Sequence, residues 1–60
     1  MNTTPITATN LLAGQVVVSD LGFTTEVAIT AIRHTGEVTV WWKGGGREDI
    51  APDDVLNVMA

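Results

Sequence analysis

The segment of residues 38–43 constrains the fold most, because it joins the strongest strand signal in the chain to both of its tryptophans. Its β-branched and aromatic side chains favour extended structure. Turn signals border the segment, with Gly36 before it and the three glycines of residues 44–46 after it. Because successive side chains of a strand point to opposite faces, Trp41 and Trp42 cannot both enter the core. The segment therefore predicts a half-buried strand with Trp42 inside and Trp41 outside.

Other segments also show strand patterns, and they lie at residues 15–19, 25–33, 47–50 and 55–58. Pro52, which two aspartates follow, predicts a single 3-10 turn before the last of these strands. The Thr-rich residues 1–10 show no clean alternation, and we expect them to form a flexible arm. The alternative for these residues is an extra edge strand, added to the same barrel or to a neighbouring subunit. The sequence thus predicts an all-β fold, with one five-stranded barrel over residues 11–60.

The central hairpin can be given a register from its apolar pattern. A three-residue loop that ends at Gly36, in the left-handed region, closes this hairpin. Apolar alternation fails between Ile29 and Ile32, so we expect a β-bulge at residues 30–31. The predicted cross-strand pairs are Arg33 with Glu37, Ile32 with Val38, Ile29 with Val40, Ala28 with Trp41, Val27 with Trp42 and Glu26 with Lys43. This register brings the apolar pairs to one face and joins charges of opposite sign.

Size and charge limit the classes of function. A chain of 60 residues makes one small domain of marginal stability. It has no cysteine, which excludes disulfides and cysteine-ligated zinc. A net charge of −4 and a pI near 4.4 argue against a nucleic-acid or anionic-membrane partner. No apolar run is long enough to span a membrane and no signal-peptide pattern is seen, so we expect a cytoplasmic protein.

Residues 27–58 resemble the Tudor and KOW-type members of the SH3-like barrels. The resemblance rests on the alternating strand at residues 38–42, the glycine turn at 44–46, and the acidic strand with its closing turn at 47–56. It implies a five-stranded SH3-like barrel that serves as a binding module. The strand at residues 25–33 and the glycine turn contain no aromatic residue, so we expect no aromatic cage for methylated side chains. The small number of Lys and Arg residues likewise argues against the RNA contacts of KOW-type modules.

Trp41 is the leading candidate for a binding site, because exposed tryptophans are enriched at the centres of protein interfaces. Around it we expect Phe23, Arg33 and Lys43, with the two cations at opposite ends of the hairpin. The alternative is that the N-terminal arm covers Trp41 within the same molecule, through Ile6 or Leu11. No catalytic, cofactor-binding or metal-binding set is predicted, since the chain has one histidine and no cysteine.

These observations predict a non-enzymatic protein–protein interaction module that needs no cofactor. One alternative is a subunit of a symmetric homo-oligomer, structural or catalytic only at the subunit interface. A second is an RNA- or DNA-associated KOW-like module, which the acidic charge disfavours. Acidic residues near the C-terminal end are expected to form a solvated rim or a docking surface for a basic partner, and they are Glu48, Asp49, Asp53 and Asp54. A small accessory protein encoded by a virus or plasmid would have these properties.

Overall fold

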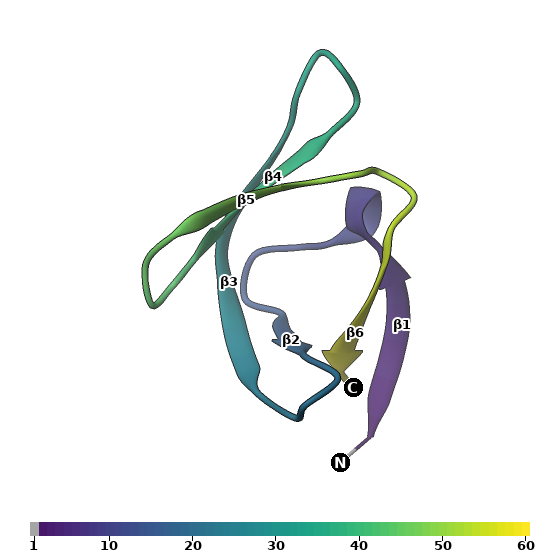
Figure 1. Ribbon diagram of the computed structural model, residues 1–60, viewed down its shortest axis with the longest axis vertical. Coiled ribbons are helices and arrows are strands. Elements are labelled where there is room, and N and C mark those ends of the chain that lie inside the picture. Colours follow the sequence, from purple (N-terminus) through teal and green to yellow (C-terminus); the bar gives the residue numbers. More distant parts are fainter. Residues whose placement is uncertain (1) are drawn as a thin grey trace.

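Six antiparallel strands form a single sheet in the computed structural model, which describes residues 2–60. In chain order they are Thr3–Thr7 (β1), Val16–Val18 (β2), Thr24–Ile32 (β3), Val38–Trp42 (β4), Arg47–Ile50 (β5) and Val55–Met59 (β6). A short 3-10 helix, η1, covers Ala8–Asn10. The order in the sheet is β1-β6-β2-β3-β4-β5, so the N-terminal strand lies beside the C-terminal one (Figure 1). The all-β class predicted from the sequence is confirmed.

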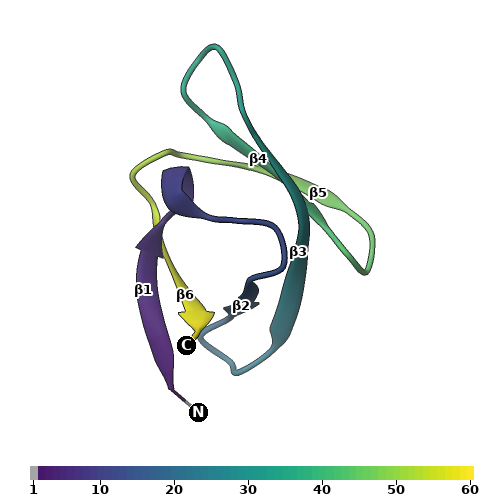
Figure 2. The same ribbon diagram turned by 180° about the vertical axis from the view of Figure 1, so that it is seen from behind.

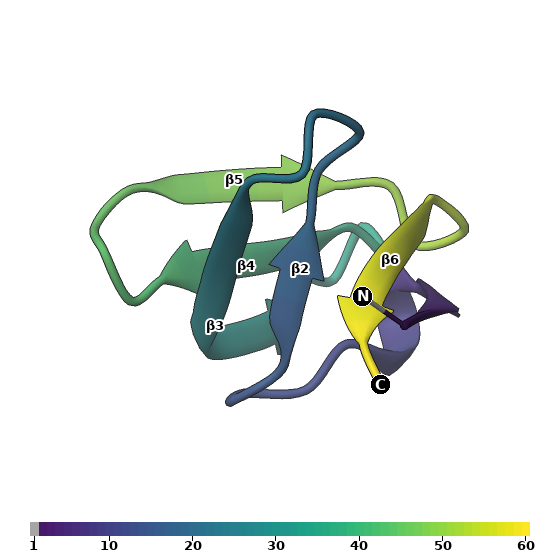
Figure 3. The same cartoon turned by 90° about the horizontal axis from the view of Figure 1, so that it is seen from below.

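The long strand β3 bends the sheet. Its first residues pair with β2, and its second half pairs with β4. A β-bulge at Ala28 lies at the start of the stretch that pairs with β4, since Val27 lies opposite Trp42 while Ile29 lies opposite Trp41. Bulges bend a strand and increase its twist. As a result β4 and β5 cross the other strands, and the sheet curls around one core without its two ends pairing (Figures 2 and 3).

The core lies inside this curl. It contains buried apolar side chains from β3 to β6 and from the N-terminal segment, and these are Ala8, Leu11, Val27, Val38, Val40, Ile50 and Val58. Partly buried side chains pack against this cluster, and they are Ile6, Val17, Trp42 and Leu56. A domain of this size buries only about 60% of the surface of its unfolded chain. Its net stability is therefore a few kcal/mol, and each core side chain carries a large share of it.

The Thr-rich N-terminal segment is part of the sheet rather than a flexible arm. Thr3–Thr7 pairs with β6 over its whole length. Ile6 and Leu11, which were candidates to cover Trp41, belong to the core instead. Pro5 is tolerated because β1 is an edge strand, where a missing N–H need not interrupt a ladder. The structure thus shows the alternative prediction for this segment, an edge strand within the same molecule.

The predicted five-stranded barrel is wrong in strand number and in closure, because the sheet has six strands and remains open between β1 and β5. The turn predicted before the last strand is present, but it does not extend into a 3-10 helix. Residues 51–54 form a single turn in which the Asp54 N–H donates to the Ala51 carbonyl at 3.1 Å. Helix η1 binds this turn, since Ala8 donates to the Asp54 carbonyl at 2.9 Å and Thr9 donates to the Pro52 carbonyl at 3.2 Å. The Pro52 and Asp54 carbonyls therefore accept hydrogen bonds from the N-terminal segment. A 3-10 helix is formed in that segment, by η1.

The predicted hairpin register is correct at both ends and wrong in the middle. At the loop end, Arg33 donates to the Glu37 carbonyl at 2.8 Å, and Gly36 has φ +95°. The pairs Ile32 with Val38, Val27 with Trp42 and Glu26 with Lys43 are also as predicted. Between them, Ile29 lies opposite Trp41 rather than Val40, because the bulge falls at Ala28 and not at residues 30–31. Thr30 is consequently turned inward, where its hydroxyl lies 3.5 Å from the Leu11 carbonyl.

Candidate functional site

A row of three side chains crosses the outer face of β3, β4 and β5. Ile29, Trp41 and Arg47 are direct partners in the two ladders, and residues directly opposite one another share a face of the sheet. Ile29 is 60% exposed and Trp41 is 36% exposed, and the Arg47 side chain is exposed beside them. We call this set the outer row. It presents an aliphatic, an aromatic and a cationic group on neighbouring strands.

Charged side chains lie on either side of the outer row. At one end, Lys43 Nζ is 3.2 Å from Glu26 Oε2. At the other end, Arg33 Nη1 is 3.8 Å from Asp49 Oδ1, and the Thr39 hydroxyl donates to the same oxygen at 2.7 Å. Ion pairs this exposed contribute little to stability. Their effect is to border the apolar centre with a polar rim.

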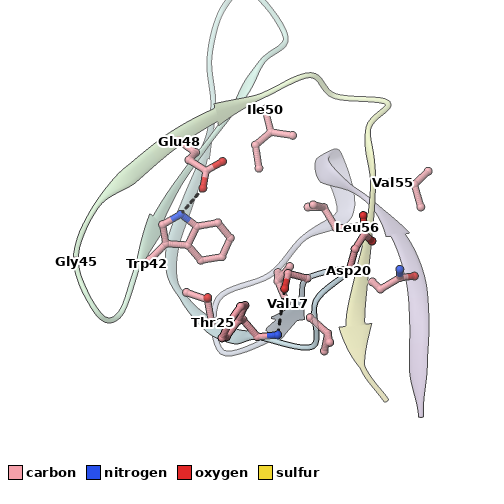
Figure 4. A pocket seen from close by; sticks show the side chains of 13 residues that line it. Val17, Asp20, Thr25, Trp42, Gly45, Glu48, Ile50, Val55 and Leu56 are labelled. Atoms are coloured by element: carbon pink, nitrogen blue, oxygen red, sulfur yellow. Dashed lines mark hydrogen bonds between the residues drawn. The ribbon is translucent and has the colours of Figure 1, made fainter. Parts of the chain in front are cut away.

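A groove opens on the opposite face, at the mouth of the curled sheet. The β2–β3 loop, the β4–β5 hairpin and the start of β6 enclose a volume of about 520 Å³. Figure 4 shows Trp42 and Glu48 on the hairpin side, across from Asp20 and Leu56. The Trp42 indole N–H donates to Glu48 Oε1 at 3.2 Å. Phe23 also lines this groove, and it is 70% exposed.

Hydrogen bonds within the β2–β3 loop fix the position of Phe23. Its N–H donates to the Ser19 hydroxyl at 3.0 Å, and its carbonyl accepts from the Ser19 N–H at 2.8 Å. Gly22 completes the turn by donating to the Ser19 carbonyl at 2.9 Å with φ +88°. That backbone angle suits glycine and few other residues. The loop therefore holds an exposed aromatic ring on a defined backbone.

The residues predicted from the sequence to form one site lie in two places. Trp41 occupies the outer face, with Arg33 and Lys43 at opposite ends of that face. Phe23 lies instead in the groove, with Trp42. Sequence reasoning missed Ile29 in the outer row, because the bulge was placed two residues too late. It also missed Arg47 as a member of the outer row. Counting every second residue from Trp41 through the glycine turn would have placed Arg47 on the same face as Trp41.

The single serine and the single histidine of the chain both lie outside the strands. Ser19 uses its hydroxyl in the loop bond described above, and His34 lies exposed in the β3–β4 turn. Among residues 2–60, no three His, Asp and Glu side chains gather closely enough to hold a metal ion. Over the same residues, no helix has the length and apolar character needed to cross a membrane.

Compared with known proteins, the chain matches no family model, no curated sequence and no solved structure.

Proposed function

We propose that this protein is a small, non-enzymatic module that binds another protein through the outer face of β3, β4 and β5. The outer row carries the proposal, because it sets Trp41 between Ile29 and Arg47 on three neighbouring strands of the sheet. Tryptophan and arginine are the residue types that most often dominate binding energy at protein interfaces. Tryptophan supplies a large contact area with only two side-chain torsions, so covering Trp41 costs little conformational entropy.

The surroundings of the outer row support this assignment. Protein interfaces combine an apolar, desolvated centre with a polar rim. Here the centre is Trp41 with Ile29, and the rim consists of the Glu26–Lys43 and Arg33–Asp49 pairs. Arg47 forms no ion pair within the described residues, so its charge is available to an acidic group of the partner.

The architecture fits the same proposal. A curled antiparallel sheet with short hairpins agrees with a relationship to SH3-like modules of the Tudor and KOW type, with β1 as an added edge strand. In this proposal the module acts in the cytoplasm, as an accessory protein that docks to a larger partner. Self-association through the outer row is the alternative, and the experiment below distinguishes the two.

The test compares capture of partner proteins by wild type and by two outer-row variants, Trp41→Ala and Ile29→Ala. Leu21→Ala is the matched control, because Leu21 is 83% exposed and lies in the β2–β3 loop away from the row. We expect both outer-row variants to lose the captured partner, with a loss of at least tenfold in affinity for Trp41→Ala. The control should retain the partner.

Sedimentation of wild type over a range of concentrations completes the test. A wild-type monomer, together with capture that depends on Trp41, supports the proposal. An oligomer that Trp41→Ala converts to a monomer favours the self-association alternative. If every association of the protein survives Trp41→Ala, the outer row is not its binding surface.

A further inference from the structure

The groove lacks cations, whereas the outer face holds every Lys and Arg side chain of the chain. The lining of the groove includes the Asp20 and Glu48 carboxylates and contains no lysine or arginine. All three Lys and Arg side chains of the chain belong to the outer face, where Arg33 and Lys43 are already paired with carboxylates. The acidic charge of the groove is therefore not neutralised from within the described part of the molecule.

We propose that the groove binds an extended basic segment of another protein, with one arginine side chain seated against Phe23 and Trp42 and beside Glu48. This site lies on the face opposite the outer row and uses different side chains. It adds a second binding function and does not depend on the first.

The aromatic rings give the groove its preference for a guanidinium group. A cation over the face of an aromatic ring is attracted by the ring quadrupole, and the planar guanidinium of arginine also stacks on such rings. Phe23 offers an exposed ring, and Trp42 lines the same groove from the β4–β5 hairpin. Two rings from separate elements thus line one groove.

Glu48 is held in place to bind the same cation. Its Oε1 accepts the hydrogen bond from the Trp42 indole at 3.2 Å, which ties the carboxylate to the aromatic ring. Its other oxygen has no hydrogen bond among the described residues. A charge-assisted hydrogen bond from an arginine to that oxygen is stronger than one between neutral groups. Trp42 and Glu48 therefore form a paired aromatic and acidic contact before any ligand arrives.

The edge of the sheet explains why the ligand is an extended chain rather than an isolated amine. Strand β5 is the last strand of the sheet and pairs only with β4. Glu48 and Ile50 of β5 line the groove, so a segment laid along β5 could use its free backbone groups and point alternate side chains inward. The groove volume of about 520 Å³ accommodates one arginine side chain that points inward from such a segment.

The experiment uses a capped peptide in which arginine and valine alternate, and a control peptide in which citrulline replaces each arginine. Citrulline keeps the shape of arginine but removes its charge. The protein is the full chain carrying Trp41→Phe, so that Trp42 is the only tryptophan and its fluorescence reports on the groove. The groove variants are Phe23→Ala and Glu48→Gln, and Glu37→Gln in the β3–β4 hairpin is the matched control. Glu48→Gln retains an acceptor for the Trp42 indole, so it tests the charge and leaves that bond in place.

We expect the arginine peptide to bind and the citrulline peptide to bind at least tenfold more weakly. Phe23→Ala and Glu48→Gln should each weaken binding of the arginine peptide by about fivefold, while Glu37→Gln should stay within about twofold of the parent. Equal affinity for the two peptides would overturn the proposal, as would an absence of binding. So would equal losses for Glu37→Gln and Glu48→Gln, because that result would indicate unspecific attraction to an acidic protein.

Discussion

Trp41 and Trp42 are neighbours in the chain and lie in opposite environments. Trp42 is half-buried, packs against the core and donates its indole N–H to Glu48. Trp41 lies on the outer face between Ile29 and Arg47, and its indole makes no hydrogen bond within residues 2–60. The difference shows how strand alternation divides two identical side chains between a half-buried position against the core and a more exposed position on the outer face.

The two faces also differ in charge. The outer face holds the cations of the chain, whereas the groove beside Trp42 holds unpaired carboxylates. The same contrast predicts how substitutions on each face will affect stability and binding.

The largest expected effect is the difference in free energy of unfolding between substitutions of Trp42 and of Trp41. We expect Trp42→Ala to lower the free energy of unfolding by about 2–3 kcal/mol, because it leaves a cavity beside a very small core. Trp41→Ala should cost about 1 kcal/mol, because only its contacts on the outer face are lost. Urea unfolding followed by circular dichroism measures both values. Trp42→Phe, expected to cost about half as much as Trp42→Ala, keeps the comparison measurable if the alanine variant unfolds. Equal costs at the two positions would contradict the assignment of Trp41 to the outer face.

A smaller effect tests the position of the bulge. Val40 is fully buried, so Val40→Thr should cost about 1–2 kcal/mol by burying a hydroxyl group. Ile29→Thr should change stability by no more than about 0.5 kcal/mol, because Ile29 is 60% exposed. The same urea experiment gives both numbers. A cost for Ile29→Thr as large as that for Val40→Thr would place Ile29 in the core, opposite Val40, and would move the bulge to residues 30–31.

The sequence was sufficient to predict features that depend on neighbouring residues. Alternation in β4 and the loop at Gly36 are local, so the strand and the two ends of the hairpin register could be predicted. The bulge could not, because both placements absorb the irregularity between Ile29 and Ile32. The structure places it where β3 passes from β2 to β4, and there Val27 also bonds to the backbone of residues 14–15. That contact is tertiary and leaves no local pattern.

Features built from distant segments were the ones that sequence reasoning missed. The threonines of β1 favour extended structure, but nothing local indicates that the strand pairs with β6 at the other end of the chain. The groove has the same origin, since it joins Asp20 and Phe23 of the β2–β3 loop to Trp42 of β4 and Glu48 of β5. Of its two carboxylates, only Glu48 belonged to the acidic rim predicted from the sequence. The outer row could be predicted in part. The exposed position of Trp41 follows from alternation within β4, whereas the position of Ile29 depends on where the bulge falls.

The smallest expected effect concerns the charged rim of the outer face. The two ion pairs there have side chains 41–70% exposed, and we expect Lys43→Met and Arg33→Met each to change stability by no more than about 0.5 kcal/mol. High salt should reduce even that difference, because exposed charges are screened. Asp49 retains its bond from Thr39 in the Arg33 variant, which limits the loss further. Urea unfolding at low and high salt, repeated over a range of protein concentrations, makes the measurement. A loss above about 2 kcal/mol that grows with protein concentration would mean that these charges are buried between copies of the chain. In that case the outer row would be the interface of a homo-oligomer, and a separate protein partner would have to bind elsewhere.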